Sequence, residues 1–510
     1  MATPSLLLKK LCSSALLLAP LFIWAQTVTI KGIANGYTQP NIAAFVQADP
    51  LSGKKEMLQQ VALGKDGSFV FTLTVNETTP ITIAIGQIEG LLFVEPDKTY
   101  DIDFPAYSAA EIKRFDKTEI TLGLKNASDG ELNILIRAFN RDYAKFLDDH
   151  FYDFAIDQYK GSESYQAKQL QKGSKSDMIP RDTAQLISVS ISNFGKILDT
   201  FDDEVHAKYQ AHYSNQYFFN YVRYSLAELD LMGGSSRKEL YKEYFMSQKV
   251  LWKNPAYMHF FEEYYNLLLT TQKKDIQDQV YVAVNAQKSY TALTELFAYD
   301  STLISLPMRE LALIKGLRDI YYNSSFVKNS VSATLESFVQ NGSDALTKRT
   351  AVNVREKFLR CKSNWPLEDF TLLDEENELW SSAEHEDKYV YYVFFANWSP
   401  SSLTELQMLQ RWYEKYNKDI HFVAICMDND YNAFKSYLAK HRDQKFTFLY
   451  GGGDFLLREK FDLRTVPHAV LVNTEGKVVG DYTRRPTEGI QMDFEKIVNQ
   501  KAKASGTWKD

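Results

Sequence analysis

The stretch that decides the fold of the last third of the chain is Val393-Phe394-Phe395-Ala396-Asn397-Trp398-Ser399-Pro400-Ser401-Ser402. Its first residues close an apolar run that begins at Tyr389, which predicts a strand buried on both faces. The residues after it, from Leu403 to Tyr416, carry apolar side chains at helical spacing. Ser399 is a favoured N-cap residue and Pro400 suits the first helical position, so the stretch predicts a turn from a buried strand into a helix.

Strands and helices continue to alternate on both sides of this turn. Phe370 to Leu373 and His421 to Met427 have the composition of strands, and a later strand follows the stretch Thr465-Val466-Pro467-His468. Such alternation predicts an α/β layered domain over residues 363–505, followed by a short tail at 506–510.

The two quoted stretches resemble the envelope thioredoxin-like family typified by TlpA and ResA. Members of that family carry Trp-Cys-Pro-x-Cys at the start of a helix and a cis-proline opposite it. The resemblance covers about residues 366 to 500, and residues 483–489 are similar to the closing segment of the family. It implies a thioredoxin-like fold in which Pro467 is the cis-proline.

The resemblance also shows what this chain lacks. Carried over position by position, the attacking and resolving cysteines fall on Ser399 and Ser402, within the degenerate motif Trp398, Ser399, Pro400, Ser401 and Ser402. The family needs a thiolate, whereas a serine hydroxyl stays protonated at neutral pH and forms no disulfide. Val393 occupies the position of the proton-relaying aspartate of thioredoxin. The chain is therefore expected to be redox-inactive, with no catalytic residue and no cofactor.

The two serines allow two interpretations. In the first they are capping residues, and Ser402 with Glu405 has the spacing of a capping box. In the second Ser399 is a nucleophile with His468 as its base, which would make the chain a hydrolase. Capping is favoured because the sequence indicates neither an orienting acid nor an oxyanion loop.

Val466, Pro467 and His468 form a second candidate site. In the family, the backbone before the cis-proline accepts an extended peptide by β-augmentation. The resemblance implies that this edge, with Trp398 beside it, binds polypeptide without reacting. A fold element that binds nothing is the alternative.

Two cysteines lie outside the N-terminal segment. Cys426 falls in a predicted buried strand and is expected to be a small core residue, and Cys361 falls in a polar connector. The sequence favours two unpaired thiols and leaves their pairing open. They carry the rival hypothesis, a TlpA/ResA-type thiol-disulfide oxidoreductase that uses non-standard thiols, which requires an exposed thiol of low pKa.

Residues 1–25 have the order of a secretory signal, with Lys9 and Lys10 before an apolar run from Ala15 to Trp24 and the small residue Ala25. The run is about half the ~20 residues of a membrane-spanning helix. Cleavage after Ala25 predicts a periplasmic protein with no transmembrane segment. It lowers the formal net charge from −7 to −9, and an acidic surface argues against nucleic-acid partners.

Residues 26–105 alternate short β-branched and aromatic runs with turn signals, which predicts an antiparallel β-sandwich-like domain. The predicted strands are Val28 to Gly32, Ala43 to Gln47, Phe69 to Val75, Ile81 to Ile85, Leu91 to Val94 and Tyr100 to Phe104. This part resembles the β-domain that precedes some periplasmic thioredoxin-like domains, a resemblance that implies no chemistry.

Residues 106–362 change to helical periodicity, which predicts an all-α middle region. Five polar residues there could suggest a metal site but fit no zinc or calcium spacing, so a solvated face is expected: Asp202, Asp203, Glu204, His206 and His212. The aromatic stretch Tyr213 to Tyr224 is expected to be helix core rather than the lining of a groove. In the last domain, Gly451 to Gly453 lacks the Lys-Ser/Thr of a phosphate loop and predicts a flexible turn before a helix capped by Asp454.

These patterns together predict an exported multidomain protein without a bound metal. The expected function is binding, as a scaffold, a chaperone-like holder of polypeptides or a subunit of a cell-envelope complex.

Overall fold

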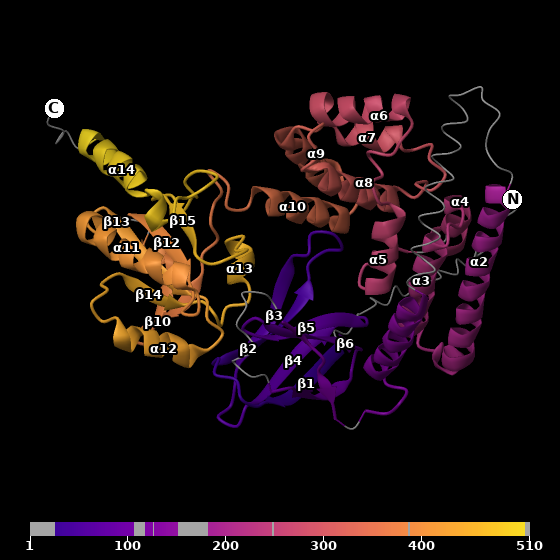
Figure 1. The fold of residues 1–510 in the computed structure, drawn as a ribbon, viewed down its shortest axis with the longest axis horizontal. Helices are drawn as coiled ribbons and strands as arrows, with labels where there is room; N and C mark the ends of the chain where they lie inside the picture. The colour runs from indigo at the N-terminus through magenta and orange to yellow at the C-terminus, as the bar shows by residue number, and fades with distance from the viewer. Residues whose placement is uncertain are drawn as a thin grey trace, which may run out of the picture.

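The computed structural model describes residues 26–106, 118–125, 127–150, 182–246, 249–385 and 388–504. The predicted signal segment and the predicted tail at 506–510 lie outside these residues. Three parts follow one another along the chain: a β-rich domain, a helical region and an α/β domain. Figure 1 shows the β-rich domain, in indigo, in contact with both of the others. The predicted fold class is confirmed.

The β-rich domain is built from two sheets that enclose one apolar core. The first has the order β4 (Ser68–Val75), β1 (Gln26–Ala34), β7 (Thr99–Phe104) and β9 (Gly123–Leu124); the second has the order β3 (Lys55–Ala62), β2 (Asn41–Gln47), β5 (Thr79–Ile85), β6 (Ile88–Val94) and β8 (Thr118–Ile120). Strand β4 shows the period-2 alternation of a half-buried strand, because Phe69, Phe71 and Leu73 face the core.

Three features of this domain differ from the prediction. It is not purely antiparallel, since β1 pairs with β7 and β6 with β8 in parallel. Strands β8 and β9 join its sheets, so the domain continues past residue 105. Strand β3 was not predicted, because it is a largely exposed edge strand whose sequence, from Lys55 to Ala62, shows no apolar alternation.

The middle region is helical, and its residues pack into two apolar clusters. One helix spans residues 132–150, and those after it are α2 (Asp182–Tyr209), α3 (Gln216–Met232), α4 (Arg237–Leu240), α5 (Pro255–Tyr264), α6 (Lys274–Tyr281), α7 (Tyr290–Leu296), α8 (Leu306–Ile320), α9 (Lys328–Asn341) and α10 (Ala345–Leu359). Phe218 and Tyr224 of α3 are buried, so this aromatic stretch is core, as predicted. No helix in the described part of the chain combines the length and the apolar character needed to cross a bilayer.

The α/β domain has a six-stranded sheet of order β11 (Leu379–Ser381), β10 (Thr371–Asp374), β14 (Thr447–Tyr450), β13 (Ile420–Cys426), β12 (Tyr389–Phe395) and β15 (His468–Val472). The three central strands are parallel, while β10 and β15 are antiparallel to their neighbours. Helices α11 (Pro400–Tyr416), α12 (Tyr431–Lys440), α13 (Leu457–Lys460) and α14 (Gln491–Ala504) complete the domain. Separate apolar clusters on the two faces of the sheet bury both sides of its central strands.

The hairpin formed by β2 and β3 connects the three parts. Leu51, at its tip, is 3% exposed and belongs to the apolar core of the helical region. The carboxylate of Asp49 accepts a hydrogen bond from Asn353 of α10 at 2.8 Å. On the other side of the hairpin, the ring of Phe45 stacks on Phe455 of the α/β domain with centroids 4.6 Å apart. The β-rich domain therefore links the α/β domain to the helical region.

Candidate functional site

The degenerate motif lies at the start of α11, as predicted. Ser399 is the N-cap residue, and its hydroxyl accepts a hydrogen bond from the backbone N–H of Ser402 at 3.3 Å. Ser399 is 5% exposed and Ser402 is fully buried, and the Ser402 hydroxyl has no hydrogen-bond partner among the described residues. Trp398, immediately before the cap, is 42% exposed. The helix start is intact without either sulfur.

The sheet brings the two predicted stretches together. Strands β12 and β15 are antiparallel, and Phe394 lies opposite His468. Continuing this register past the end of β12 places the turn that carries Trp398 beside the Val466–Pro467 peptide bond, which is cis. The conformation implied for Pro467 by the family resemblance is confirmed.

The predicted capping box is wrong. Glu405 does not reach back to the start of its own helix; its buried carboxylate accepts hydrogen bonds from the backbone N–H and the hydroxyl of Thr487, at 2.9 and 2.7 Å. Thr487 belongs to the short helix η5 (Pro486–Glu488). The capping-box pattern considers only residues three positions apart. It could not predict this contact, because Glu405 and Thr487 are 82 residues apart in the chain.

A buried carboxyl that the sequence reasoning missed lies behind the motif. Asp428, just after β13, accepts the backbone N–H of Asn397 at 2.9 Å and the thiol of Cys426 at 3.0 Å. Burial raises the pKa of the Asp428 carboxyl. No sequence pattern distinguishes Asp428 from the neighbouring Asp430, since only the end of β13 places it against the motif.

Neither cysteine forms a disulfide. Cys426 is completely buried, and burial raises the pKa of its thiol, so it is the core residue that was predicted. Burial also raises the pKa of Cys361 to about 12, and its thiol donates to the carbonyl of Lys460 at 3.4 Å. Because the thiolate is the reactive form, both thiols are poorly suited to exchange.

A cavity of about 460 Å³ lies along β15, and we call it the β15 cavity. Four segments form its walls. They are the connector between the helical region and the α/β domain (residues 360–362), the loop before the cis-proline (including Phe461, Asp462, Arg464 and Thr465), Pro467 with the first residues of β15 (residues 468–470), and residues 480–483. Pro467 and His468 line it, while the side chain of Val466 packs against the core below. Two of the three residues of the predicted binding edge therefore line a cavity that is partly open to solvent.

His468 is not positioned as a base for Ser399. The Ser399 hydroxyl is within hydrogen-bond distance of the Ser401 hydroxyl, at 3.1 Å, and no hydrogen bond joins it to His468 in the described part of the chain. Burial lowers the pKa of His468 and keeps its ring neutral near pH 7. The hydrolase hypothesis has no support in this geometry.

Two other sequence features have structural roles. Nε2 of His206 lies 3.5 Å from Asp202 and Nδ1 contacts the Tyr213 hydroxyl, and no group of three metal-ligating side chains converges among the described residues. The predicted flexible turn at Gly451 to Gly453 is a close packing contact, because a Cβ on Gly452 would lie 1.8 Å from the carbonyl oxygen of Asp428. Asp454 caps the following turn by accepting the N–H of Leu456 and of Leu457, at 2.9 and 3.0 Å.

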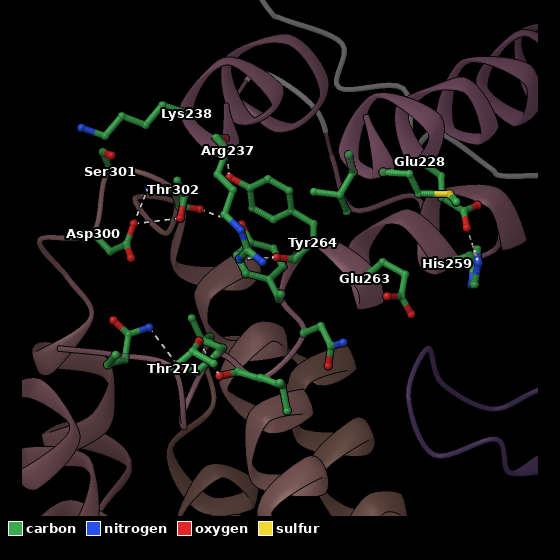
Figure 2. Close-up of a pocket in the computed structure, with 17 residues that line it drawn as sticks. Glu228, Arg237, Lys238, His259, Glu263, Tyr264, Thr271, Asp300, Ser301 and Thr302 are labelled. Atoms are coloured by element: carbon green, nitrogen blue, oxygen red, sulfur yellow. Dashed lines mark hydrogen bonds and ion pairs between the residues drawn. The ribbon is translucent and has the colours of Figure 1, made fainter. Parts of the chain in front are cut away.

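A larger cavity, about 1030 Å³, lies in the helical region away from the motif (Figure 2). Several of its polar side chains are already hydrogen-bonded to other residues of the lining. Arg237 donates to the carbonyl of Tyr264 at 2.7 Å while the Tyr264 hydroxyl donates to the carbonyl of Arg237, and His259 is 2.9 Å from Glu228. Size alone therefore does not identify the site, and we place the candidate site at the β15 cavity, which Pro467 and His468 line.

Comparisons with known proteins match the last domain of the chain. The model of a family described as Thioredoxin-like matches residues 387–478, and no curated protein matches the chain. Among solved structures, one similar chain is a Bacteroides vulgatus protein assigned as a thiol-disulfide oxidoreductase, at 25% identity over 26% of this chain and 96% of that one, with a TM-score of 0.25. Another is the thioredoxin domain of a Bacteroides vulgatus thiol-disulfide oxidoreductase, at 18% identity over 26% and 97%, with a TM-score of 0.24. A third is an exposed lipoprotein thioredoxin of Streptococcus pneumoniae, at 19% identity over 25% and 99%, with a TM-score of 0.23. The last domain of the chain is thioredoxin-like.

Proposed function

We propose that this chain, whose C-terminal domain is thioredoxin-like, is an exported, redox-inactive protein that binds extended polypeptide segments along β15. It would act as a scaffold, a chaperone-like holder or a subunit of a cell-envelope complex. One observation carries the proposal: the two positions at the start of α11 where the related family has its thiols are the buried serines Ser399 and Ser402.

The remaining thiols support the same conclusion. Cys426 is inaccessible, and the raised pKa of Cys361 leaves almost no thiolate at neutral pH. An oxidoreductase needs an attacking thiolate, and none of the described residues supplies one. Two observations support binding: Pro467 and His468 line the β15 cavity, and Trp398, in the turn before α11, is 42% exposed.

The proposed function is tested by measuring the binding of one probe protein in its folded and in its unfolded state. The probe is ribonuclease A, either native or reduced and carbamidomethylated so that it stays unfolded without added charge. We expect the mature protein to bind the unfolded form and not the native form, measured by fluorescence anisotropy. Failure to bind either form would refute the proposed function.

Substitution of Trp398 locates the binding surface. Removing an exposed aromatic anchor from an interface costs about 1–3 kcal/mol, so Trp398→Ala should weaken binding about 5- to 150-fold. Tyr299→Ala is the matched control, because Tyr299 is a 97% exposed aromatic residue in the helical region. An equal effect of the two substitutions would show that binding is nonspecific.

Export is tested separately. Mass spectrometry of the protein purified from the periplasmic fraction should find Gln26 as its first residue. Retention of residues 1–25 in the purified protein would contradict the proposed signal cleavage.

A further inference from the structure

The outer edge of β15 is only partly paired. Leu471 uses both of its backbone groups on that side, since its N–H donates to the Thr483 hydroxyl at 3.2 Å and its carbonyl accepts from Val479 at 2.8 Å. Residues two apart in a strand point their backbone groups the same way, so the N–H and carbonyl of Ala469 also face outward. In the described part of the chain, no hydrogen bond reaches them.

The chain leaves the sheet where this second pair would form. Gly480 has φ +79°, a left-handed conformation that glycine adopts without strain. After Val479 the described backbone no longer pairs with β15, and only the Thr483 hydroxyl returns to Leu471. Residues 480–483 then form the far wall of the β15 cavity, and Ala469 lies in the near wall. The cavity occupies the place of a missing neighbouring strand.

The unpaired groups are shielded from bulk water. Ala469 is only 4% exposed, and residues 360–362 of the connector from the helical region form one wall of the cavity. That connector is held in place, because Ser363 donates to Asp481 and Asn364 donates to the carbonyl of Val478, both at 2.9 Å. A shielded amide without a partner is unfavourable, so a ligand backbone that pairs with it gains stability.

We propose that an extended polypeptide segment enters the β15 cavity as an additional strand and pairs its backbone with both outer groups of Ala469. That the ligand is a polypeptide rests on the proposed function. What is new here is the position at which its backbone pairs with β15. It places the segment between β15 and residues 480–483, beside Cys361 of the connector, rather than at the backbone of Val466. Recognition by backbone pairing accepts many sequences, which suits a holder of polypeptides.

Amide hydrogen exchange tests the register in the unaltered protein. The ligand is the unfolded, carbamidomethylated ribonuclease A used above. At a free concentration ten times its Kd, a new hydrogen bond should slow exchange of the Ala469 amide about 11-fold. The Leu471 amide is the internal control, because it already donates to Thr483 and should change little. Unchanged exchange at Ala469 on a saturated protein would overturn the inference.

A pair of substitutions gives a second readout. Ala469→Pro removes the N–H, while Ala469→Ser keeps it. We expect Ala469→Pro to reduce affinity at least tenfold and Ala469→Ser to retain it. If Ala469→Pro does not fold, the exchange experiment decides alone. Loss of binding by the wild-type protein would refute the proposed function, whereas binding that leaves Ala469 unprotected refutes only this register.

Discussion

The double substitution Ser399→Cys/Ser402→Cys is expected to install thiol–disulfide exchange in a chain that we propose lacks this activity. Position 399 is the N-cap of a 17-residue helix and is nearly buried. A helix N-terminus stabilises an anion there by up to about 2 kcal/mol, which lowers a thiol pKa by about 1.5 from its usual ~8.5 to ~7. At pH 7.0 the thiolate fraction then rises from about 3% to about 50%.

The assay is reduction of insulin by the mature protein with dithiothreitol, beside the double variant. We expect no acceleration by the wild type and clear acceleration by the double variant. Ser399→Cys/Ser402→Ala is the matched control, because it retains the attacking thiol and lacks the resolving one. Its alkylation rate against pH gives the pKa of the thiol at position 399.

Two results would refute this reasoning. Insulin reduction by the wild type would contradict the proposed redox inactivity and turn attention to Cys361. A folded double variant whose thiol at position 399 keeps a pKa near 8.5 would show that the start of α11 no longer stabilises an anion. The lost chemistry would then involve more than the missing sulfurs.

Three further predictions concern stability, each measured by urea unfolding. Leu51→Ala should lower the free energy of unfolding by about 2–5 kcal/mol, because Leu51 fills the helical core, whereas Leu379→Ala at a 74% exposed position should change it little. Ser402→Ala should be neutral or stabilising by up to about 1 kcal/mol, because it removes a buried hydroxyl without a partner; a clear loss would reveal an unseen contact. Burial lowers the pKa of His468, so keeping its ring neutral contributes stability above about pH 6.5, and this stability is lost as the pH falls. His468→Gln should therefore lose less free energy of unfolding than the wild type between pH 7.5 and 5.5. An unchanged pH dependence in His468→Gln would contradict that assignment.

The edge strand β3 illustrates the limit of pattern recognition within a domain. Its residues, from Lys55 to Ala62, have little apolar alternation, because one of its edges and most of its side chains face solvent. What makes it a strand is the ladder to β2, which the sequence of β3 does not encode by itself. Strand β4 was predicted, because its alternating Phe69, Phe71 and Leu73 face the core.

Gly452 and Glu405 of the α/β domain show that sequence patterns also misassign residues near the site. Gly452 was expected to provide flexibility, but it is required by the close approach of the Asp428 carbonyl. Glu405 was assigned to its own helix start, but it is bound by Thr487. Both errors arise because the deciding partner is distant in sequence.

The sequence by itself determined the features that depend on neighbouring residues. Helical and strand periodicity established the three parts, and the run from Trp398 to Ser402 established that serines occupy positions 399 and 402 and that Ser399 caps a helix. Tertiary structure alone decided that Leu51 joins the helical core, that residues 360–362 line the β15 cavity and that the outer backbone groups of Ala469 have no hydrogen-bond partner among the described residues. These features depend on pairing and packing between segments far apart in the chain. Helix and strand propensities depend on nearby residues and do not predict such contacts.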